Sequence, residues 1–156
     1  MGTDINLRKM ALSEYQEISH RSFEEYFVEC SLVSGESVDS IRSRVGAAPT
    51  EPSSNDRWYM VEKEGQSCGY CWVQIDTPKK EAFGYDIFLE KAVRGMGLGR
   101  QVMEKGKKLL GEMGINKVKI CVFEGNSPAR GLYGSLGFKE IRRVPTKGQI
   151  ELETVF

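Results

Sequence analysis

"VRGMGLGRQVMEKGKKLLGEMG", residues 93–114, places three alternating glycines directly before a segment with helical character. The start of a helix leaves several backbone N–H groups unpaired and carries partial positive charge. Glycines let such a backbone approach a ligand without Cβ atoms in the way, and Arg94 and Arg100 add countercharge. The stretch therefore predicts an anion site, most often one for phosphate, at the N-terminus of a helix. The apolar stripe of that helix consists of Leu98, Val102, Leu109 and Met113, widened by Met103 and Leu110.

Two common phosphate-binding loops do not fit these residues. A Walker loop requires Gly-Lys followed by Ser or Thr, whereas Gly99 is followed by Arg100 and Gln101. The dinucleotide fingerprint G-x-G-x-x-G, started at Gly95, would place its last glycine where Arg100 stands. Taken alone, the loop is equally compatible with a tight turn that binds no ligand.

The patterns around the loop predict a mixed order of strands and helices. Ser13 and Ser127 are the expected N-caps of two helices, and Gly137 is the expected C-terminal cap of the second. Hairpins together with one strong β-α-β unit indicate one α/β (α+β) domain over residues 1–156, with a mixed sheet. The predicted elements are a strand at 4–10, helices at 13–29 and 37–45, a hairpin at 57–76, a strand at 82–90, the helix after the glycines, a strand at 115–123, a helix at 127–137 and a terminal hairpin of 138–144 with 149–156 around Lys147-Gly148.

Two separated motifs resemble those of the GNAT superfamily of N-acetyltransferases. "VRGMGLG", residues 93–99, is similar to the acetyl-CoA signature Arg/Gln-x-x-Gly-x-Gly/Ala, with Arg94, Gly97 and Gly99 in the signature positions. "NSPARGLYGSLGF", residues 126–138, is similar to the second motif, an Asn followed by a helix that carries Leu-Tyr and ends in Gly-Phe. Both motifs in this order make the resemblance specific, although the first part of the chain matches only in the order of its elements.

The resemblance implies a fold and a cosubstrate. It implies a mixed, mostly antiparallel central sheet, flanked by helices and splayed between the fourth and fifth strands. The pantetheine arm of acetyl-CoA would lie in that gap and bond the backbone near Phe88 and Leu89, with Asn126 on the other side. Lys91 departs from the pattern, since many members have proline there, but this affects a turn and not the chemistry. The residues implied to hold the pyrophosphate are Arg94 and the backbone amides of Gly95, Met96, Gly97, Leu98, Gly99 and Arg100.

The implied reaction is direct transfer of acetyl from acetyl-CoA to an amine in a ternary complex, without a metal. An amine with a pKa of about 10.4 is neutral in only about one molecule in 2,500 at pH 7, so the site must accept a proton. Tyr133 occupies the Leu-Tyr position of the second motif, and the resemblance implies that its hydroxyl donates a proton to the leaving thiolate. The alternative is that Tyr133 is a core residue of its helix. The backbone N–H of Leu89 or a neighbour is the implied donor to the oxyanion.

The base is predicted from a carboxylate in an apolar strand. Alternation along that strand predicts Tyr85 and Ile87 on one face and Asp86 on the other. A carboxylate there is costly unless it is paired or faces a cleft, so Asp86 is expected to be the base or the anchor of the amine, with a structural ion pair as the alternative. Further candidates for the base are Glu124, at the end of the fifth strand, and His20, on the first helix.

The acceptor has no readable motif. The resemblance implies that residues 23–56 shape its site, and a small-molecule or peptide amine is expected. Two other functions stay open: an acyl-CoA sensor without turnover, and a nucleotide-binding domain, against which Arg100 argues. The aromatic side chains that would line an acceptor pocket, or equally pack in the core, are Phe23, Tyr26, Phe27 and Trp72.

Composition argues against several classes of partner. The 156 residues have a net charge of 0 and a pI of about 6.6, so a nucleic-acid partner is not expected. No apolar stretch approaches the roughly 20 residues that span a bilayer, and the N-terminus lacks a signal peptide. We therefore expect a cytoplasmic monomer or homodimer without a membrane partner. Cys68 and Cys71 form a single C-x-x-C beside one histidine in the chain, so no metal site is expected.

Overall fold

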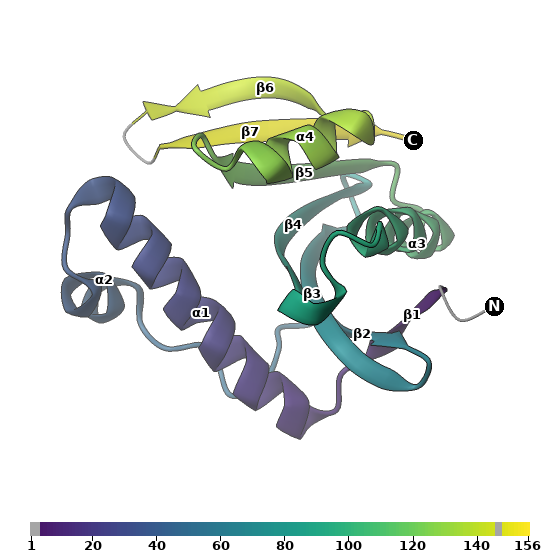
Figure 1. Cartoon of the computed structure of the whole chain (residues 1–156), viewed down its shortest axis with the longest axis horizontal. Helices are drawn as coiled ribbons and strands as arrows, with labels where there is room; N and C mark the ends of the chain where they lie inside the picture. The colour runs from purple at the N-terminus through teal and green to yellow at the C-terminus, as the bar shows by residue number, and fades with distance from the viewer. Residues whose placement is uncertain (1–3, 146–147) are drawn as a thin grey trace.

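The computed structural model describes residues 4–145 and 148–156, which form a seven-stranded sheet with helices on both faces (Figure 1). The order of elements follows the predicted one. Their bounds are β1 (Ile5–Lys9), α1 (Leu12–Ser34), α2 (Val38–Val45), β2 (Asp56–Lys63), β3 (Gln66–Asp76), β4 (Glu81–Leu89), the 3₁₀ helix η1 (Lys91–Val93), α3 (Leu98–Glu112), β5 (Lys117–Phe123), α4 (Ser127–Ser135), β6 (Lys139–Val144) and β7 (Gln149–Val155).

The sheet has the order β1-β2-β3-β4-β5-β7-β6, and each neighbouring pair is antiparallel except β4 with β5. The parallel pairing joins only Glu81–Gly84 to Lys117–Ile120, and beyond it the two strands diverge (Figure 1). The predicted mixed, mostly antiparallel sheet, splayed between its fourth and fifth strands, is therefore confirmed. The terminal hairpin places β7 between β5 and β6, and the Lys147 predicted at its turn lies outside the described residues.

Neighbouring side chains along a strand point to opposite faces of the sheet and pack into separate hydrophobic cores. Val61 of β2 packs with Leu98 at the start of α3, whereas the neighbouring Met60 packs with Tyr15 of α1. Helices α1 and α3 therefore cover opposite faces of the first half of the sheet. A third core lies between α4, the end of α3 and the strands β5 and β7.

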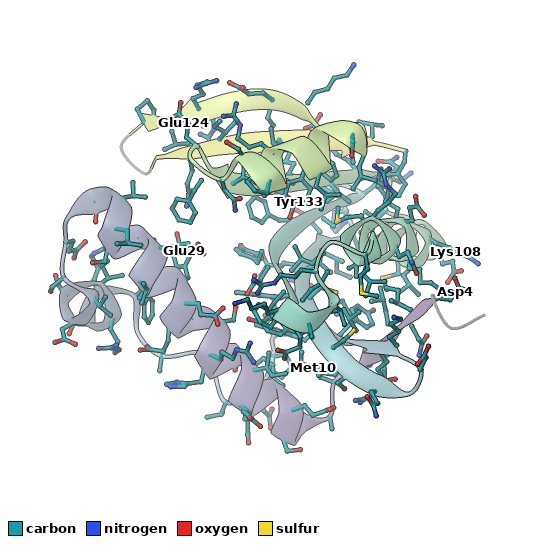
Figure 2. All side chains as sticks on the ribbon, viewed as in Figure 1. Asp4, Met10, Glu29, Lys108, Glu124 and Tyr133 are labelled. Atoms are coloured by element: carbon teal, nitrogen blue, oxygen red, sulfur yellow. The ribbon has the colours of Figure 1, made fainter. Side chains whose placement is uncertain are left out.

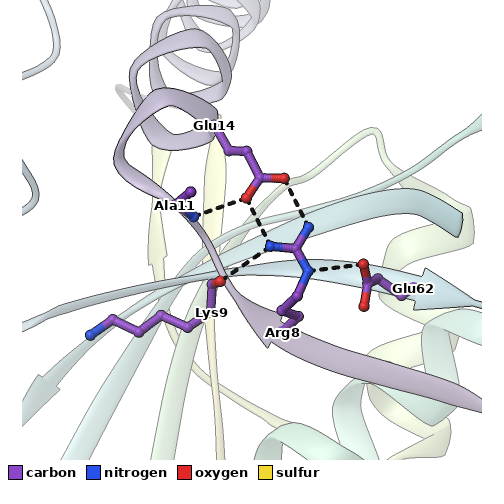
Figure 3. A network of polar contacts seen from close by, with 5 residues as sticks. All are labelled: Arg8, Lys9, Ala11, Glu14 and Glu62. Atoms are coloured by element: carbon purple, nitrogen blue, oxygen red, sulfur yellow. Dashed lines mark hydrogen bonds and ion pairs between the residues drawn. The ribbon is translucent and has the colours of Figure 1, made fainter. Parts of the chain in front are cut away.

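Helix α1 begins at a network of charged side chains (Figure 3). Glu14 accepts a hydrogen bond from the backbone N–H of Ala11 at 2.9 Å, and its two oxygens accept from Arg8 at 2.9 and 2.8 Å. Arg8 also donates to Glu62 at 2.9 Å. The predicted cap at Ser13 is wrong, because Glu14 supplies the acceptor and moves the N-cap to Ala11. The same side chains connect the helix to β1 and β2.

The predicted end of this helix is too early. The helix continues past residue 29 to Ser34, although its apolar pattern thins there. It stops at Gly35, whose left-handed backbone (φ 78°) lets its N–H donate to the carbonyl of Ser31 at 2.9 Å.

The N-cap of α4 lies one residue earlier than expected. Asn126, and not Ser127, is the N-cap, because its side-chain oxygen accepts from the backbone N–H of Ala129 at 3.3 Å. Gly137 follows the C-cap Leu136 in a left-handed conformation (φ 90°), which confirms the predicted end of the helix.

We predict that Glu14→Gln lowers the free energy of unfolding by about 1 kcal/mol at pH 7, because it weakens both the cap and the contact with Arg8. The hydrogen bonds from Arg8 lower the pKa of Glu14 from 4.5 to about 2. The stabilisation is therefore present above pH 4.5 and lost as the pH falls toward 2, so the difference from the wild type shrinks across this window.

Urea denaturation at a series of pH values measures this difference. Glu17→Gln is the matched control, since Glu17 is exposed on the same helix. An equal loss of stability in both variants would contradict the proposed role of Glu14.

Candidate active site

A bulge in β4 sets the direction of its central side chains. Trp72 of β3 lies opposite Asp86, and Val73 lies opposite Gly84, so Tyr85 has no partner across the pair. The ring of Tyr85 stacks on Trp72 with centroids 4.4 Å apart. Tyr85 and Asp86 therefore both face the side covered by α1. The predicted alternation, with Tyr85 on the face of Ile87, is wrong because the extra residue breaks the two-residue period.

The glycine loop has the shape of an open helix start. Gly95 and Gly97 have left-handed backbones (φ 78° and 77°), and a Cβ at either would meet open space. The backbone N–H groups of residues 95–100 donate no hydrogen bond to another described residue. Gly99 is different, because a Cβ there would lie 3.1 Å from the side chain of Leu132 on α4. The first two glycines thus shape the loop, and the third allows α3 to approach α4.

Basic side chains lie around this loop, most of them with partners. The Nε of Arg94 donates to the carbonyl of Leu89 at 2.8 Å, and its guanidinium lies 5.4 Å from the ring of Phe88. Arg100 instead donates to Ser135 of α4 at 2.8 Å. The guanidinium of Arg21 on α1 lies 4.2 Å from the centre of the Phe88 ring. Arg21 was not singled out from the sequence. No local pattern in α1 indicates this position.

Asp86 has a hydrogen-bond partner but no cation. Ser22 of α1 donates to its carboxylate at 2.6 Å, and no described Lys, Arg or His forms an ion pair with it. The alternative of a structural ion pair therefore fails within the described residues. Burial raises the pKa of Asp86, and the Ser22 hydrogen bond opposes this effect. The carboxylate is thus held on the α1 face with a raised proton affinity.

Tyr133 both packs in a core and points toward this region. Its side chain is 8% exposed and meets Phe138 edge-on at 5.5 Å. It projects from α4 into the region between α4 and β4 (Figure 2), and its hydroxyl has no hydrogen bond to a described residue. Burial, with a contribution from the charge of Asp86, raises the pKa of Tyr133 to about 12. The tyrosine therefore keeps its proton at neutral pH.

The other candidate bases lie elsewhere. Glu124 is mostly exposed at the end of β5 and pairs with Arg143 of β6 at 2.7 Å (Figure 2). His20 is exposed on α1, whereas Ser19 and Ser22 of the same helix are buried. The structure brings neither candidate to the Asp86 carboxylate.

The aromatic residues considered for an acceptor pocket separate into two groups. Phe27 is 1% exposed and belongs to the interior. Phe23 stacks on Trp72 at 5.8 Å, and Trp72 stacks in turn on Tyr85. Tyr26 is 44% exposed and lies 6.5 Å from the ring of Phe123 on β5. Phe23 and Trp72 thus lie with Tyr85 on the α1 side of the sheet, whereas Tyr26 contacts the end of β5.

Two carboxylates of α1 were missed by the sequence analysis. Glu25 and Glu29 follow Ser22 at three and seven residues, which is the spacing of one helical face. Burial and the charges of Asp86 and Glu25 raise the pKa of Glu29. The helical spacing from Ser22 could have indicated that Glu25 and Glu29 share its face. That spacing pointed to the site only once Ser22 was known to contact Asp86.

A surface depression of about 410 Å³ lies apart from these groups. Its lining belongs to α4, β6 and β7 and includes Arg130, Phe138 and Glu140. In the part of the chain that the structure describes, no group of three or more His, Cys, Asp or Glu is arranged to hold a metal ion. No helix in those ranges combines the length and apolarity needed to cross a membrane.

Comparison with models of protein families identifies the family to which this chain belongs. Residues 12–138 match the model of the acetyltransferase (GNAT) family. The chain belongs to the GNAT family. The match includes both motifs that suggested the resemblance, together with the first two helices, which resembled the family only in the order of elements.

Individual relatives have the same fold. Over 92 residues the chain is 34% identical to the N-acetyltransferase YycN of Bacillus subtilis, an alignment that covers 58% of this chain and 59% of that protein. The chain thus spans little more than half of the length of the curated relatives that it matches first. The crystal structure of YycN has a TM-score of 0.75 at 24% identity, covering 90% of this chain and 95% of that one.

A second solved structure with a similar fold contains coenzyme A. The PaiA N-acetyltransferase of Thermoplasma acidophilum, solved in complex with coenzyme A, has a TM-score of 0.69 at 15% identity. The alignment covers 99% of this chain and 100% of that one. At this identity the likeness shows the fold.

We predict that Ser22→Ala raises the pKa of Asp86 further, because a hydrogen bond to the charged form is removed. Titration of the aspartate carboxyl carbons by NMR measures the change. Ser19→Ala is the control, since Ser19 is equally buried on this face but bonds Tyr15. An unchanged or lowered Asp86 pKa in Ser22→Ala would contradict the prediction.

Proposed function

We propose that this protein transfers an acetyl group from acetyl-CoA to an amine in one step within a ternary complex. The observation that carries the proposal is the open start of α3, residues 95–100, beside the gap where β4 leaves β5. Six unpaired N–H groups at the positive end of a helix form a site for a pyrophosphate. Membership of the GNAT family and the fold shared with an N-acetyltransferase solved with coenzyme A support this function.

In this proposal the cosubstrate extends from the loop along β4. The amides of residues 95–100 bind the pyrophosphate, and the pantetheine arm lies between β4 and β5 near Phe88 and Leu89. Arg94 is bonded to the Leu89 carbonyl, so it is poised to exchange that bond for a phosphate oxygen. Asn126 acts mainly by capping α4, which holds that helix along the other side of the gap.

Asp86 is proposed to receive the proton of the amine. The nitrogen attacks the thioester carbonyl, the new carbon–nitrogen bond forms, and the carbon–sulfur bond breaks to release the coenzyme A thiolate. A carboxylate with a raised pKa is a better proton acceptor than an ordinary aspartate. Ser22 holds it in position through its 2.6 Å hydrogen bond.

Tyr133 is proposed to stabilise the thiolate as a hydrogen-bond donor. Its pKa of about 12 lies above the value of about 8.5 that is typical of a thiol, so complete transfer of its proton to the thiolate would be unfavourable by about 3.5 pKa units. A hydrogen bond to the developing negative charge requires no such transfer. The role of this residue is therefore electrostatic and not that of a full acid.

We predict that Gly97→Glu abolishes binding of coenzyme A. The new side chain would stand in a left-handed backbone position (φ 77°) and bring a negative charge to the anion site. Isothermal calorimetry measures binding, and circular dichroism checks that the variant is folded. Gly111→Glu is the control, because it places the same side chain in open space further along α3. A folded Gly97→Glu variant that binds coenzyme A as tightly as the wild type would contradict the proposed pyrophosphate site.

We predict release of free thiol from acetyl-CoA when primary amines are added. Tyr133→Phe should lower kcat by about 10- to 100-fold, with little change in the affinity for acetyl-CoA, because only the developing thiolate loses a partner. Tyr59→Phe, on β2, is the control. Binding of coenzyme A without turnover across the amines would favour an acyl-CoA sensor, and unchanged kcat in Tyr133→Phe would remove Tyr133 from the mechanism.

A further inference from the structure

A row of carboxylates faces the proposed acetyl-transfer site from α1. Ser22, Glu25 and Glu29 lie on one face of the helix, and Ser22 contacts Asp86 of β4 directly. Figure 2 shows that Glu29 points from α1 toward the region into which Tyr133 also projects. The charges of Asp86 and Glu25 act on Glu29. The acceptor side of the site therefore carries negative charge from two facing elements.

The basic side chains of the two helices do not neutralise this charge at Glu29. Arg21 bonds Glu25 at 3.3 Å, Arg42 bonds Glu24 and Asp39, and Arg44 bonds Glu36 at 2.8 Å. His20 is exposed and makes no ion pair. Within the described residues, Glu29 and Asp86 thus have no cationic partner. Asp86 is partly removed from water, a setting in which carboxylates are normally paired, whereas Glu29 is exposed and open to a ligand.

A buried hydroxyl lies beside the same carboxylates. Tyr70 of β3 is 1% exposed, and its hydroxyl interacts with the side chains of Ser22 and Asp86. Its ring stacks on Phe88 at 5.3 Å. Burial, together with the charges of Asp86 and Glu25, raises the pKa of Tyr70. Tyr70 therefore extends the polar cluster of Ser22 and Asp86 into the sheet.

Aromatic rings form the remaining wall. Tyr85 is 48% exposed and stacks on Trp72, which also stacks on Phe23. The bulge turns Tyr85 to the same face as Asp86. Aromatic faces attract cations and cover methylene chains. The combination of unpaired carboxylates and exposed rings is complementary to an alkylammonium ion.

We infer that the acceptor is a small aliphatic amine that carries a second amino group, which stays protonated at neutral pH. The reacting nitrogen lies at Asp86, and the retained ammonium group pairs with Glu29 while its methylene chain lies against Tyr85 and Trp72. Glu29 is seven residues from Ser22, or roughly 10 Å along the helix, so a chain of several methylene groups is needed between the nitrogens. This inference rests on the proposed acetyltransferase activity.

Steady-state kinetics with putrescine and n-butylamine test the inference, because the two probes have the same carbon chain and differ in the second amino group. The wild type should have a kcat/KM at least about tenfold higher for putrescine. Glu29→Gln should lower this ratio about tenfold, and Glu29→Asp should retain part of it. Glu17→Gln, on the exposed side of α1, should keep the wild-type ratio. Added salt should lower the ratio, because it screens the ion pair.

The outcomes separate this inference from the proposed function. Acetylation of both amines with equal kcat/KM, or a ratio that Glu29→Gln leaves unchanged, overturns the second-charge inference and leaves the acetyltransferase intact. A lysine-containing peptide that is acetylated faster than putrescine also overturns it. Absence of transfer to every amine removes the proposed function itself. A putrescine preference that is lost in Glu29→Gln and kept in Glu17→Gln supports the inference.

Discussion

The end of the pairing between β4 and β5 at Gly84 is the constraint on which the site depends. A Cβ on Gly84 would lie only 2.8 Å from the side chain of Ile120, so glycine allows the strands to pair closely up to this point. The next residue, Tyr85, is the bulge. Beyond it β4 follows β3 alone, and the backbone edge that faced β5 becomes available. A continuous parallel pair would have closed the space that the site requires.

The divergence places two chemically different surfaces next to each other. On one side, the start of α3 presents the unpaired amides of residues 95–100, and this surface suits an anion. On the other side, the bulge directs Tyr85 and Asp86 toward α1, and this surface suits a cation. Tyr133 reaches the region between them from α4 (Figure 2). In the proposed function, an anionic donor and a cationic acceptor therefore approach from opposite sides without competing for the same groups.

The position of α1 decides the charge of the proposed acceptor side. The helix is held at its first turn by the bonds of Glu14 to Arg8, which also joins Glu62 of β2, and further along by the bond of Ser22 to Asp86. These two attachments orient the face that carries Glu29. Arg21 pairs with Glu25 of this face, and Arg42 and Arg44 pair with carboxylates elsewhere, so Glu29 has no cationic partner among the described residues. In the proposed function the helix thus contributes both structure and recognition.

Local patterns were enough to predict the element order and the mixed sheet, because glycine conformation, helix caps and side-chain periodicity act between residues close in sequence. The same patterns led to the anion site, which stays a prediction. Asp86 was singled out for the same reason, as a charge in an apolar strand. Only the tertiary structure decided that Tyr85 and Asp86 share a face and that Ser22 contacts Asp86. It also decided how exposed Glu29 is. A bulge depends on the neighbouring strand, and a helix face acquires a function only from the surface that it meets. The contact between Ser22 and Asp86 joins residues 64 positions apart.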